Sequence, residues 1–153
     1  MELVYLRELH QRMKKDSVGR IPCSSEEVTQ LEEHLKIKLP RAYREFLLTI
    51  GKYFGPSCVG TECCYNDLFD LLETAEKILI FDKLPISLPN DAFVFTMHQG
   101  YQFGFLRLSE GDDPAIYWYN ECKQPFVDFD CIYPTFSFYL SEEVYSNSVF
   151  GHL

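Results

Sequence analysis

The spacing of apolar residues changes once along the chain, and this change limits the folds that the sequence can adopt. In the first third, apolar side chains recur every three to four positions, which is the period of a helix with one buried face. After residue 92 they recur at every second position, which is the period of a strand. Helices followed by strands indicate an α+β fold, because a parallel α/β sheet would require the two to alternate.

Three helices are predicted in the first third. The first spans residues 2–16, and the second follows Ser24, which forms a capping box with Glu27. The third begins at Pro40, whose fixed φ suits a first helical turn. We expect it to end at Gly51 with a left-handed cap, which a residue without Cβ adopts most easily.

The middle of the chain is interpreted as a loop followed by a helix. Residues 52–66 mix Gly, Pro and Cys, and we expect a loop there with a short strand near Cys58 and Val59. Helical spacing then returns, and a helix is predicted over residues 74–81. Whether this helix starts earlier, near Leu68, stays open because a strand also fits that stretch.

Four short strands are predicted in the second half. Polar connections of hairpin length separate them, so they should form an antiparallel meander. A C-terminal helix over residues 134–146 follows, and residues 1–153 form one domain with a central sheet. The alternating side chains of the four strands are Phe93, Phe95 and Met97; Tyr101, Phe103 and Phe105; Ile116 and Trp118; and Val127, Phe129 and Cys131.

His98 stands where the first two strands meet, in the sequence His-Gln-Gly. It is either a catalytic base at the tip of a hairpin or part of an ordinary turn. The chain contains neither G-x-S-x-G nor H-E-x-x-H. We therefore favour a turn with a positive φ at Gly100, and we predict no catalytic residue and no cofactor. A hydrolase that uses His98 with Cys or Asp partners is the less favoured alternative.

The charge balance favours one kind of partner. The chain has 23 acidic and 14 basic residues, for a formal net charge of -9. Such a charge repels phosphate backbones and attracts basic surfaces, so we expect a basic protein as partner and no nucleic acid. The opening residues lack the pattern of a signal peptide, and no stretch approaches the roughly 20 apolar residues of a membrane span. We expect a cytoplasmic protein without membrane contact, monomeric or weakly dimeric.

Six cysteines are present, and their spacing is poor for zinc. The adjacent pair Cys63 and Cys64, and the Cys58-x4-Cys63 spacing, lack a second pair of ligands. Without a secretion signal, reduced thiols are the default. We expect six free thiols and no metal.

A set of motifs runs in order from residue 21 to residue 140. The later stretches are FVFTMHQGYQFGFLRL, DDPAIYWYNE and PTFSFYL. The opening motif is carried by Leu31-Glu32, Leu39-Pro40, Tyr43, Phe46-Leu47 and Gly51. This ordered set resembles the SUKH superfamily, which includes yeast regulators of cell-wall and glucan synthesis and many bacterial toxin-immunity proteins. The later stretches are similar to the family's central strands and terminal helix, and Ile50 departs slightly from the Asn that the family often has before its Gly.

The resemblance implies an α+β fold without catalytic activity that binds other proteins. Its bacterial members commonly neutralise a cognate toxin, often a nuclease or deaminase, and its yeast members act as regulatory modules. We expect the first function, with a regulatory scaffold as the alternative. The resemblance itself defines no set of binding residues.

The partner-binding surface is predicted on the meander. Asp128 and Asp130 should share one strand face, and Tyr117 and Tyr119 another, and a mixture of acids and tyrosines suits protein interfaces. A solvated face is the plain alternative. A glycosidase pair and a metal site are less favoured, the metal site because no EF-hand spacing is present. The predicted contact residues are Glu110, Asp112, Asp113, Tyr117, Tyr119, Glu121, Asp128 and Asp130.

Overall fold

The arrangement of helices and strands follows the order expected from the sequence. A computed structural model describes residues 1–56, 59–123 and 125–145. In these ranges the helices are α1 (Arg7–Met13), α2 (Ser25–Leu35), α3 (Arg41–Ile50), α4 (Leu71–Phe81) and α5 (Phe136–Tyr139), with a 3-10 turn η2 (Leu108–Glu110) and a π-helical segment η3 (Leu140–Tyr145). The strands are β1 (Thr61–Glu62), β2 (Ala92–His98), β3 (Gln102–Arg107), β4 (Ile116–Asn120) and β5 (Asp130–Tyr133).

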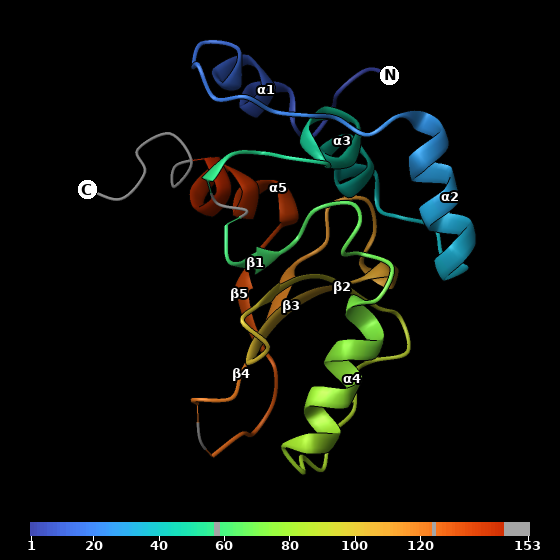
Figure 1. Cartoon of the computed structure of the whole chain (residues 1–153), viewed down its shortest axis with the longest axis vertical. Coiled ribbons are helices and arrows are strands. Elements are labelled where there is room, and N and C mark those ends of the chain that lie inside the picture. The colour runs from blue at the N-terminus through green and yellow to red at the C-terminus, as the bar shows by residue number, and fades with distance from the viewer. Residues whose placement is uncertain (57–58, 124, 146–153) are drawn as a thin grey trace.

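The five strands form one antiparallel sheet in chain order, β1-β2-β3-β4-β5. Helices precede the meander and a helix follows it, so the α+β fold is confirmed (Figure 1). The connection between β2 and β3 is the predicted hairpin: Gln99 and Gly100 have φ of 50° and 75°, and the Tyr101 N–H donates to the His98 carbonyl at 3.2 Å. His98 is therefore the last residue of β2, directly before the turn.

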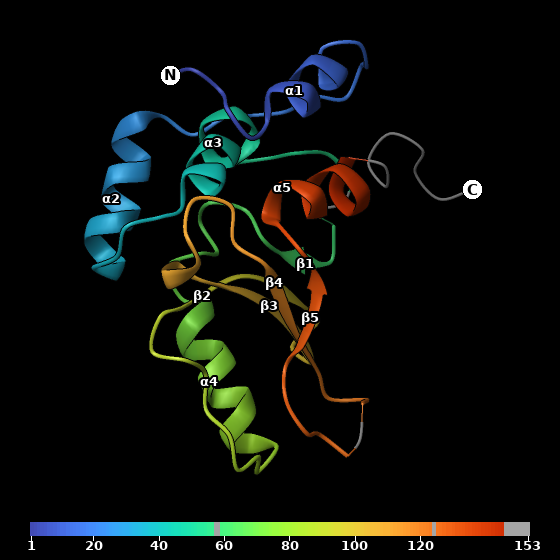
Figure 2. The same cartoon turned by 180° about the vertical axis from the view of Figure 1, so that it is seen from behind.

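The sheet lies between helices on its two faces. In Figures 1 and 2, α3 and α5 lie above the sheet and α4 below it. Above the sheet, Tyr43 of α3 lies edge-on to Phe93 of β2, with ring centroids 4.9 Å apart. Below it, the Tyr119 hydroxyl of β4 donates to Asp82, the residue that ends α4. Aromatic side chains therefore pack on both faces of the sheet, and Tyr119 also lies against Phe103 on the lower one.

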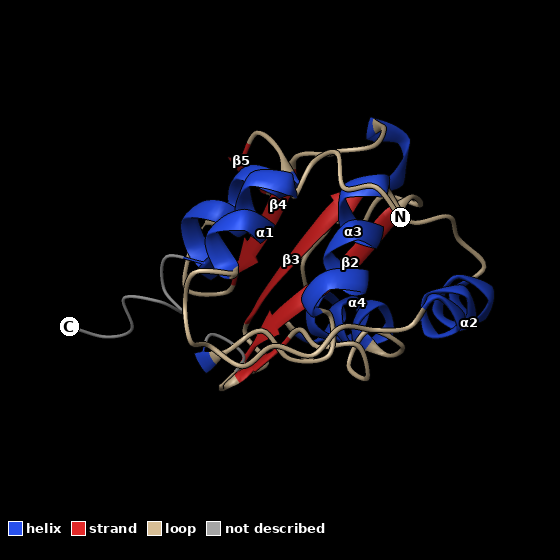
Figure 3. Ribbon diagram, turned by 90° about the horizontal axis from the view of Figure 1, so that it is seen from above, coloured by secondary structure: helices blue, strands red, loops and turns tan. Residues whose placement is uncertain are grey.

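Two glutamates explain how α2 and α3 begin and connect. The predicted capping box is confirmed, because the Glu27 N–H donates to Ser24 Oγ at 3.2 Å and the Ser24 N–H donates to Glu27 Oε2 at 2.9 Å. The buried carboxylate of Glu32 accepts the Leu39 N–H at 2.9 Å and Arg44 Nη1 at 2.8 Å. Glu32 therefore fixes the connection between the helices, while α2 itself lies to one side of the sheet (Figure 3).

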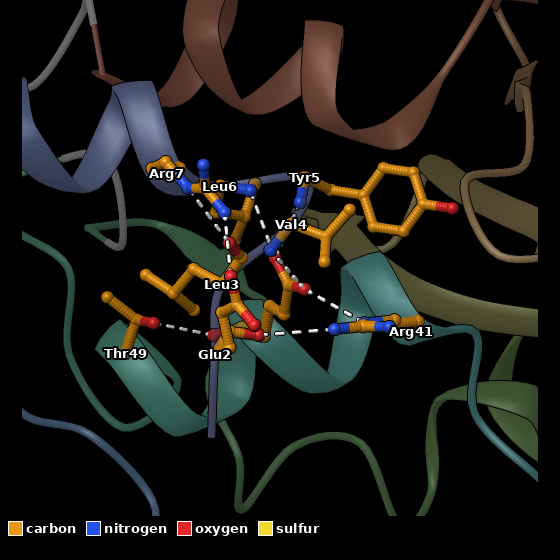
Figure 4. A network of polar contacts seen from close by, with 9 residues as sticks. Glu2, Leu3, Val4, Tyr5, Leu6, Arg7, Arg41 and Thr49 are labelled. Atoms are coloured by element: carbon orange, nitrogen blue, oxygen red, sulfur yellow. Dashed lines mark hydrogen bonds and ion pairs between the residues drawn. The ribbon is translucent and has the colours of Figure 1, made fainter.

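The N-terminal helix is shorter than predicted, since α1 begins at Arg7 rather than Glu2. The cause is the fully buried carboxylate of Glu45 on α3. It accepts the backbone N–H groups of residues 4, 5 and 6 at 2.8, 2.9 and 3.0 Å (Figure 4). N–H groups at the start of a helix have no partner within it, and here the Glu45 carboxylate takes this place and holds residues 4–6 in a bend directly before α1.

Two predictions about the loop around residue 51 are wrong. Gly51 has a φ of -66°, so it is not a left-handed cap. A glycine is needed there for another reason: a Cβ would lie 2.6 Å from the Leu47 Cα. The short strand is Thr61–Glu62, Val59 lies in a turn before it, and Cys58 lies outside the described residues.

The last predicted strand and the helices before and after the meander differ from the predictions in their ends. The helix predicted over residues 74–81 starts earlier, at Leu71. The C-terminal helix begins after its cap Thr135 and runs into η3, and Ser146, the last residue of the prediction, lies outside the described residues. β5 begins only at Asp130, and the Val127 side chain is 86% exposed.

The late start of β5 has a cause in aromatic packing. The Phe126 ring lies 5.5 Å from the ring of Tyr119, and the Phe129 ring lies 4.9 Å from that of Phe105. These contacts draw residues 126–129 under the lower face of the sheet, so the segment cannot continue the strand.

Of the described residues, no helix combines the length and the apolar character that a membrane crossing requires.

Candidate functional site

Six of the eight residues predicted to bind a partner flank β4 in the chain, and the other two, Tyr117 and Tyr119, lie within it. Three precede the strand, close to α3, because the Asp112 carbonyl accepts the Ala42 N–H at 2.9 Å. Three follow the strand, and one of these, Asp130 at the start of β5, pairs with Trp118 in the middle of β4. The chain connects β4 to β5 below the sheet (Figure 1). We name the first set, Glu110, Asp112 and Asp113, the upper acidic group, and the second set, Glu121, Asp128 and Asp130, the lower acidic group.

The upper acidic group is partly used inside the protein. Asp113 accepts the Ser137 N–H at 2.9 Å and the Ser137 hydroxyl at 2.6 Å, which fixes the start of α5. Glu110 accepts the Tyr117 hydroxyl at 2.6 Å, and this bond raises the pKa of Tyr117 to about 12. Glu110 and Asp112 are exposed, so two of the three carboxylates remain at the surface.

The two tyrosines share one sheet face, as predicted, but this face is turned toward the protein interior. Tyr119 is fully buried, and both its burial and its bond to Asp82 raise its pKa. Tyr117 is half-buried and stacks on Phe105, with ring centroids 5.4 Å apart. The prediction that Tyr119 contacts a partner is therefore corrected: its hydroxyl is held in the core.

The lower acidic group is exposed, although its geometry differs from the prediction. Asp128 precedes β5 and accepts the Phe129 N–H at 2.7 Å, so it does not share a strand face with Asp130. Asp130 forms an ion pair with Lys123. The carboxylates of Glu121, Asp128 and Asp130 nevertheless lie in one stretch of chain around the end of β4.

A pocket of about 660 Å³ opens on the upper face of the sheet, where the sequence predicted no site. Trp118, in antiphase to the two tyrosines, forms part of its lining. The indole lies on Gly104, where a Cβ would come within 2.5 Å of the ring, and its Nε1 donates to Gln102 Oε1 at 3.1 Å. The Trp118 side chain is half-buried.

The other walls of this pocket come from the middle and from the C-terminal part of the chain. Thr61 and His98 lie on the side of β1, where Thr61 Oγ1 and His98 Nδ1 share a hydrogen bond of 3.0 Å. Tyr133 of β5 and Glu143 of η3 lie on another side, and the Tyr133 hydroxyl donates to the Glu143 carboxylate. Burial together with this bond raises the pKa of Tyr133 to about 12. We name this cavity the Trp118 pocket.

The sequence held one signal for the Trp118 pocket. A glycine inside a strand often marks the close approach of another group, and Gly104 interrupts the aromatic residues of β3. Its cross-strand neighbour in the sheet is Trp118, which covers it. The alternation along the strand indicates that Trp118 and the two tyrosines lie on opposite faces of the sheet, but it does not show which face has a cavity.

Among the described residues, no group of three or more His, Cys, Asp or Glu side chains is arranged to hold a metal ion. Cys23 is buried, and burial raises the pKa of its thiol to about 11, with the charge of Glu27 adding to the effect. Cys122 and Cys131 are exposed. The thiol of Cys23 is therefore less accessible to solvent than those of Cys122 and Cys131.

The sequence matches one protein family. A family model described as SMI1 / KNR4 family (SUKH-1) matches residues 22–142, which include α2, the whole sheet and α5. No curated protein matches the chain.

Proposed function

The chain belongs to the SMI1 / KNR4 family (SUKH-1), and from this membership we propose that it is a non-catalytic protein-binding domain that neutralises a cognate toxin of the nuclease or deaminase type. The observation that carries the proposal is the match over residues 22–142. It includes the fold core and both predicted binding regions. The toxin is expected to meet this chain in the cytoplasm.

The charge of the chain supports a basic partner. At a formal net charge of -9, the protein attracts surfaces rich in Lys and Arg. A nuclease has such a surface along the groove that holds its substrate, and carboxylates placed there would stand in for the displaced phosphates. We propose that the exposed members of the two acidic groups make this contact: Glu110, Asp112, Glu121, Asp128 and Asp130.

The contacts of His98 support a structural role rather than a catalytic one. Its ring joins the edge strand β1 to β2 through Thr61 and lies edge-on to Tyr101, with ring centroids 5.8 Å apart. A general base acts through a nucleophile at one nitrogen and an orienting group at the other. The contacts of His98 are those of a side chain that closes a hairpin.

The proposal predicts a toxin with a C-terminal nuclease or deaminase domain encoded beside this chain, and that domain is used for the test. We expect co-expression of this chain to restore growth of cells that produce the toxin domain, and the two purified proteins to form a 1:1 complex in which the toxin is inactive. Full toxin activity in the presence of excess chain would overturn the proposal.

Two other results would assign a different function. A complex with a neighbouring cell-wall or signalling protein that leaves its activity intact would indicate a regulatory scaffold. Substrate turnover by this chain alone, abolished by His98→Ala, would indicate a hydrolase.

A further inference from the structure

We propose that the Trp118 pocket binds an arginine side chain of the protein partner, so that one guanidinium is anchored between the sheet and η3. This inference rests on the proposed function only in that the arginine belongs to a basic partner protein. It adds a second contact region, on the upper face of the sheet, to the acidic groups at the ends of β4.

The size of the pocket fits a side chain with part of its backbone. Its volume of about 660 Å³ lies in the range of roughly 300–1,000 Å³ that is usual for ligand sites. The lining comes from Phe54, Pro56 and Val59, from the sheet, from Tyr139 of α5 and from η3. A segment of a partner can therefore enter with one side chain inside and its neighbours at the rim.

The chemistry of the lining favours a planar cation. Trp118, Tyr133 and Tyr139 supply three aromatic rings, and all three side chains are half-buried. Glu143 adds a negative charge next to Tyr133. Aromatic faces attract cations, and a guanidinium also stacks on a ring, which the more strongly hydrated ammonium of lysine does less well. Carboxylates and guanidinium groups further match in geometry.

The aromatic floor is already in place before a ligand arrives. The Trp118 indole is fixed by contact with Gly104 and by its bond to Gln102. The hydrogen bond between Thr61 and His98 holds the opposite wall. Because these side chains need not be ordered on binding, little of the binding energy is lost to conformational entropy.

The first experiment uses the intrinsic fluorescence of Trp118, which is the only tryptophan of the chain. The probes are the N-acetyl methylamides of arginine, lysine and norleucine, added to the wild-type protein. We expect a saturable change in emission with the arginine probe, with a dissociation constant on the order of 1 mM, as is usual for so small a ligand. The lysine probe should bind at least about threefold more weakly than the arginine probe, and the norleucine probe should cause no saturable change. Equal changes with all three probes, or none with arginine, would overturn the inference.

The second experiment tests the carboxylate with a matched pair of variants. Glu143→Gln should weaken binding of the arginine probe by about threefold, as expected for a partly exposed ion pair. Glu142→Gln removes the same charge from a neighbouring exposed residue that does not line the pocket, and it should leave binding unchanged. Equal affinities of both variants and wild type would contradict the proposed role of Glu143. The wild-type titration remains decisive if a variant fails to fold.

These results are separable from the proposed function. Toxin inhibition without arginine binding in the pocket would overturn the pocket inference alone. Arginine binding by a chain that leaves the toxin fully active would overturn the toxin-neutralising function alone.

Discussion

Asp91 shows how this acidic chain uses a single carboxylate to fasten its fold. It accepts Arg107 Nη2 at 2.9 Å and the Ser109 N–H at 3.1 Å, and it also accepts the Ser109 hydroxyl. These bonds join the chain just before β2 to the end of β3. The bonds from Ser109, followed by those from Arg107, lower the pKa of Asp91 to about 2.

The contribution of Asp91 to stability should depend on pH. Because its folded pKa of about 2 lies below the ordinary value of 3.8, the stabilisation is complete above about pH 4 and is lost as the pH falls toward 2. Asp91→Asn should cost about 1 kcal/mol of unfolding free energy at pH 7, and this cost should shrink between pH 4 and 2. Urea unfolding at each pH measures it. Glu76→Gln, on the exposed side of α4, is the control and should show no such change; a cost for Asp91→Asn that is equal at pH 7 and pH 2 would contradict this role.

The cysteines should differ in reactivity because their surroundings differ. The raised pKa of Cys23, about 11 against 9.0, leaves about 100-fold less thiolate at pH 8 than an ordinary thiol has. In the folded protein, iodoacetamide should label the exposed Cys122 and Cys131 within the time in which Cys23 stays unmodified. Peptide mass spectrometry follows each site. In the unfolded, unreduced chain we expect six reactive thiols, and two or fewer would show that the cysteines are oxidised.

At the scale of helices and strands, local patterns were sufficient where an element is specified by its own residues. The capping box of α2, the helical stripe of α3 and the turn at Gly100 were all predicted from short stretches. Prediction was wrong where distant residues decide. The start of α1 depends on Glu45, about 40 positions away, and the start of β5 depends on Phe129 packing under the sheet.

The N-terminal segment should therefore loosen when the Glu45 carboxylate is altered. Glu45→Gln replaces one acceptor oxygen by an NH₂ group that faces backbone donors, and we expect a loss of about 2 kcal/mol in unfolding free energy. Amide hydrogen exchange at residues 4–6 should accelerate more than in α3. Glu33→Gln, at an exposed position of α2, serves as control. Unchanged exchange at residues 4–6 would mean that the carboxylate does not hold this segment.

At the scale of the whole molecule, the sequence predicted the sign of the charge and the stretch of chain that bears the lower acidic group. It did not predict which side chains are exposed. The predicted alternation places Tyr119 and Trp118 on opposite faces of the sheet, as the structure does. Only the three-dimensional packing shows that the Tyr119 side chain is buried and that the Trp118 side chain lines a pocket. The Trp118 pocket also needs η3, which lies far from β3 and β4 in the sequence, so the local signal at Gly104 was not sufficient to reveal it.

The central claim is that an acidic surface of this chain binds a basic protein. The measurement that tests it most directly is the affinity for the inhibited toxin domain across a series of salt concentrations, with wild type and with Asp128→Lys/Asp130→Lys. Exposed charges mainly raise the association rate and are screened by salt. We expect the double reversal to weaken binding, to flatten its salt dependence and to leave folding nearly unchanged.

The control is Glu8→Lys/Glu33→Lys, which changes the net charge equally at exposed positions of α1 and α2. It should retain most of the affinity. If the reversal of Asp128 and Asp130 leaves both the affinity and its salt dependence as in wild type, the lower acidic group is only a solvated surface and the claim is wrong.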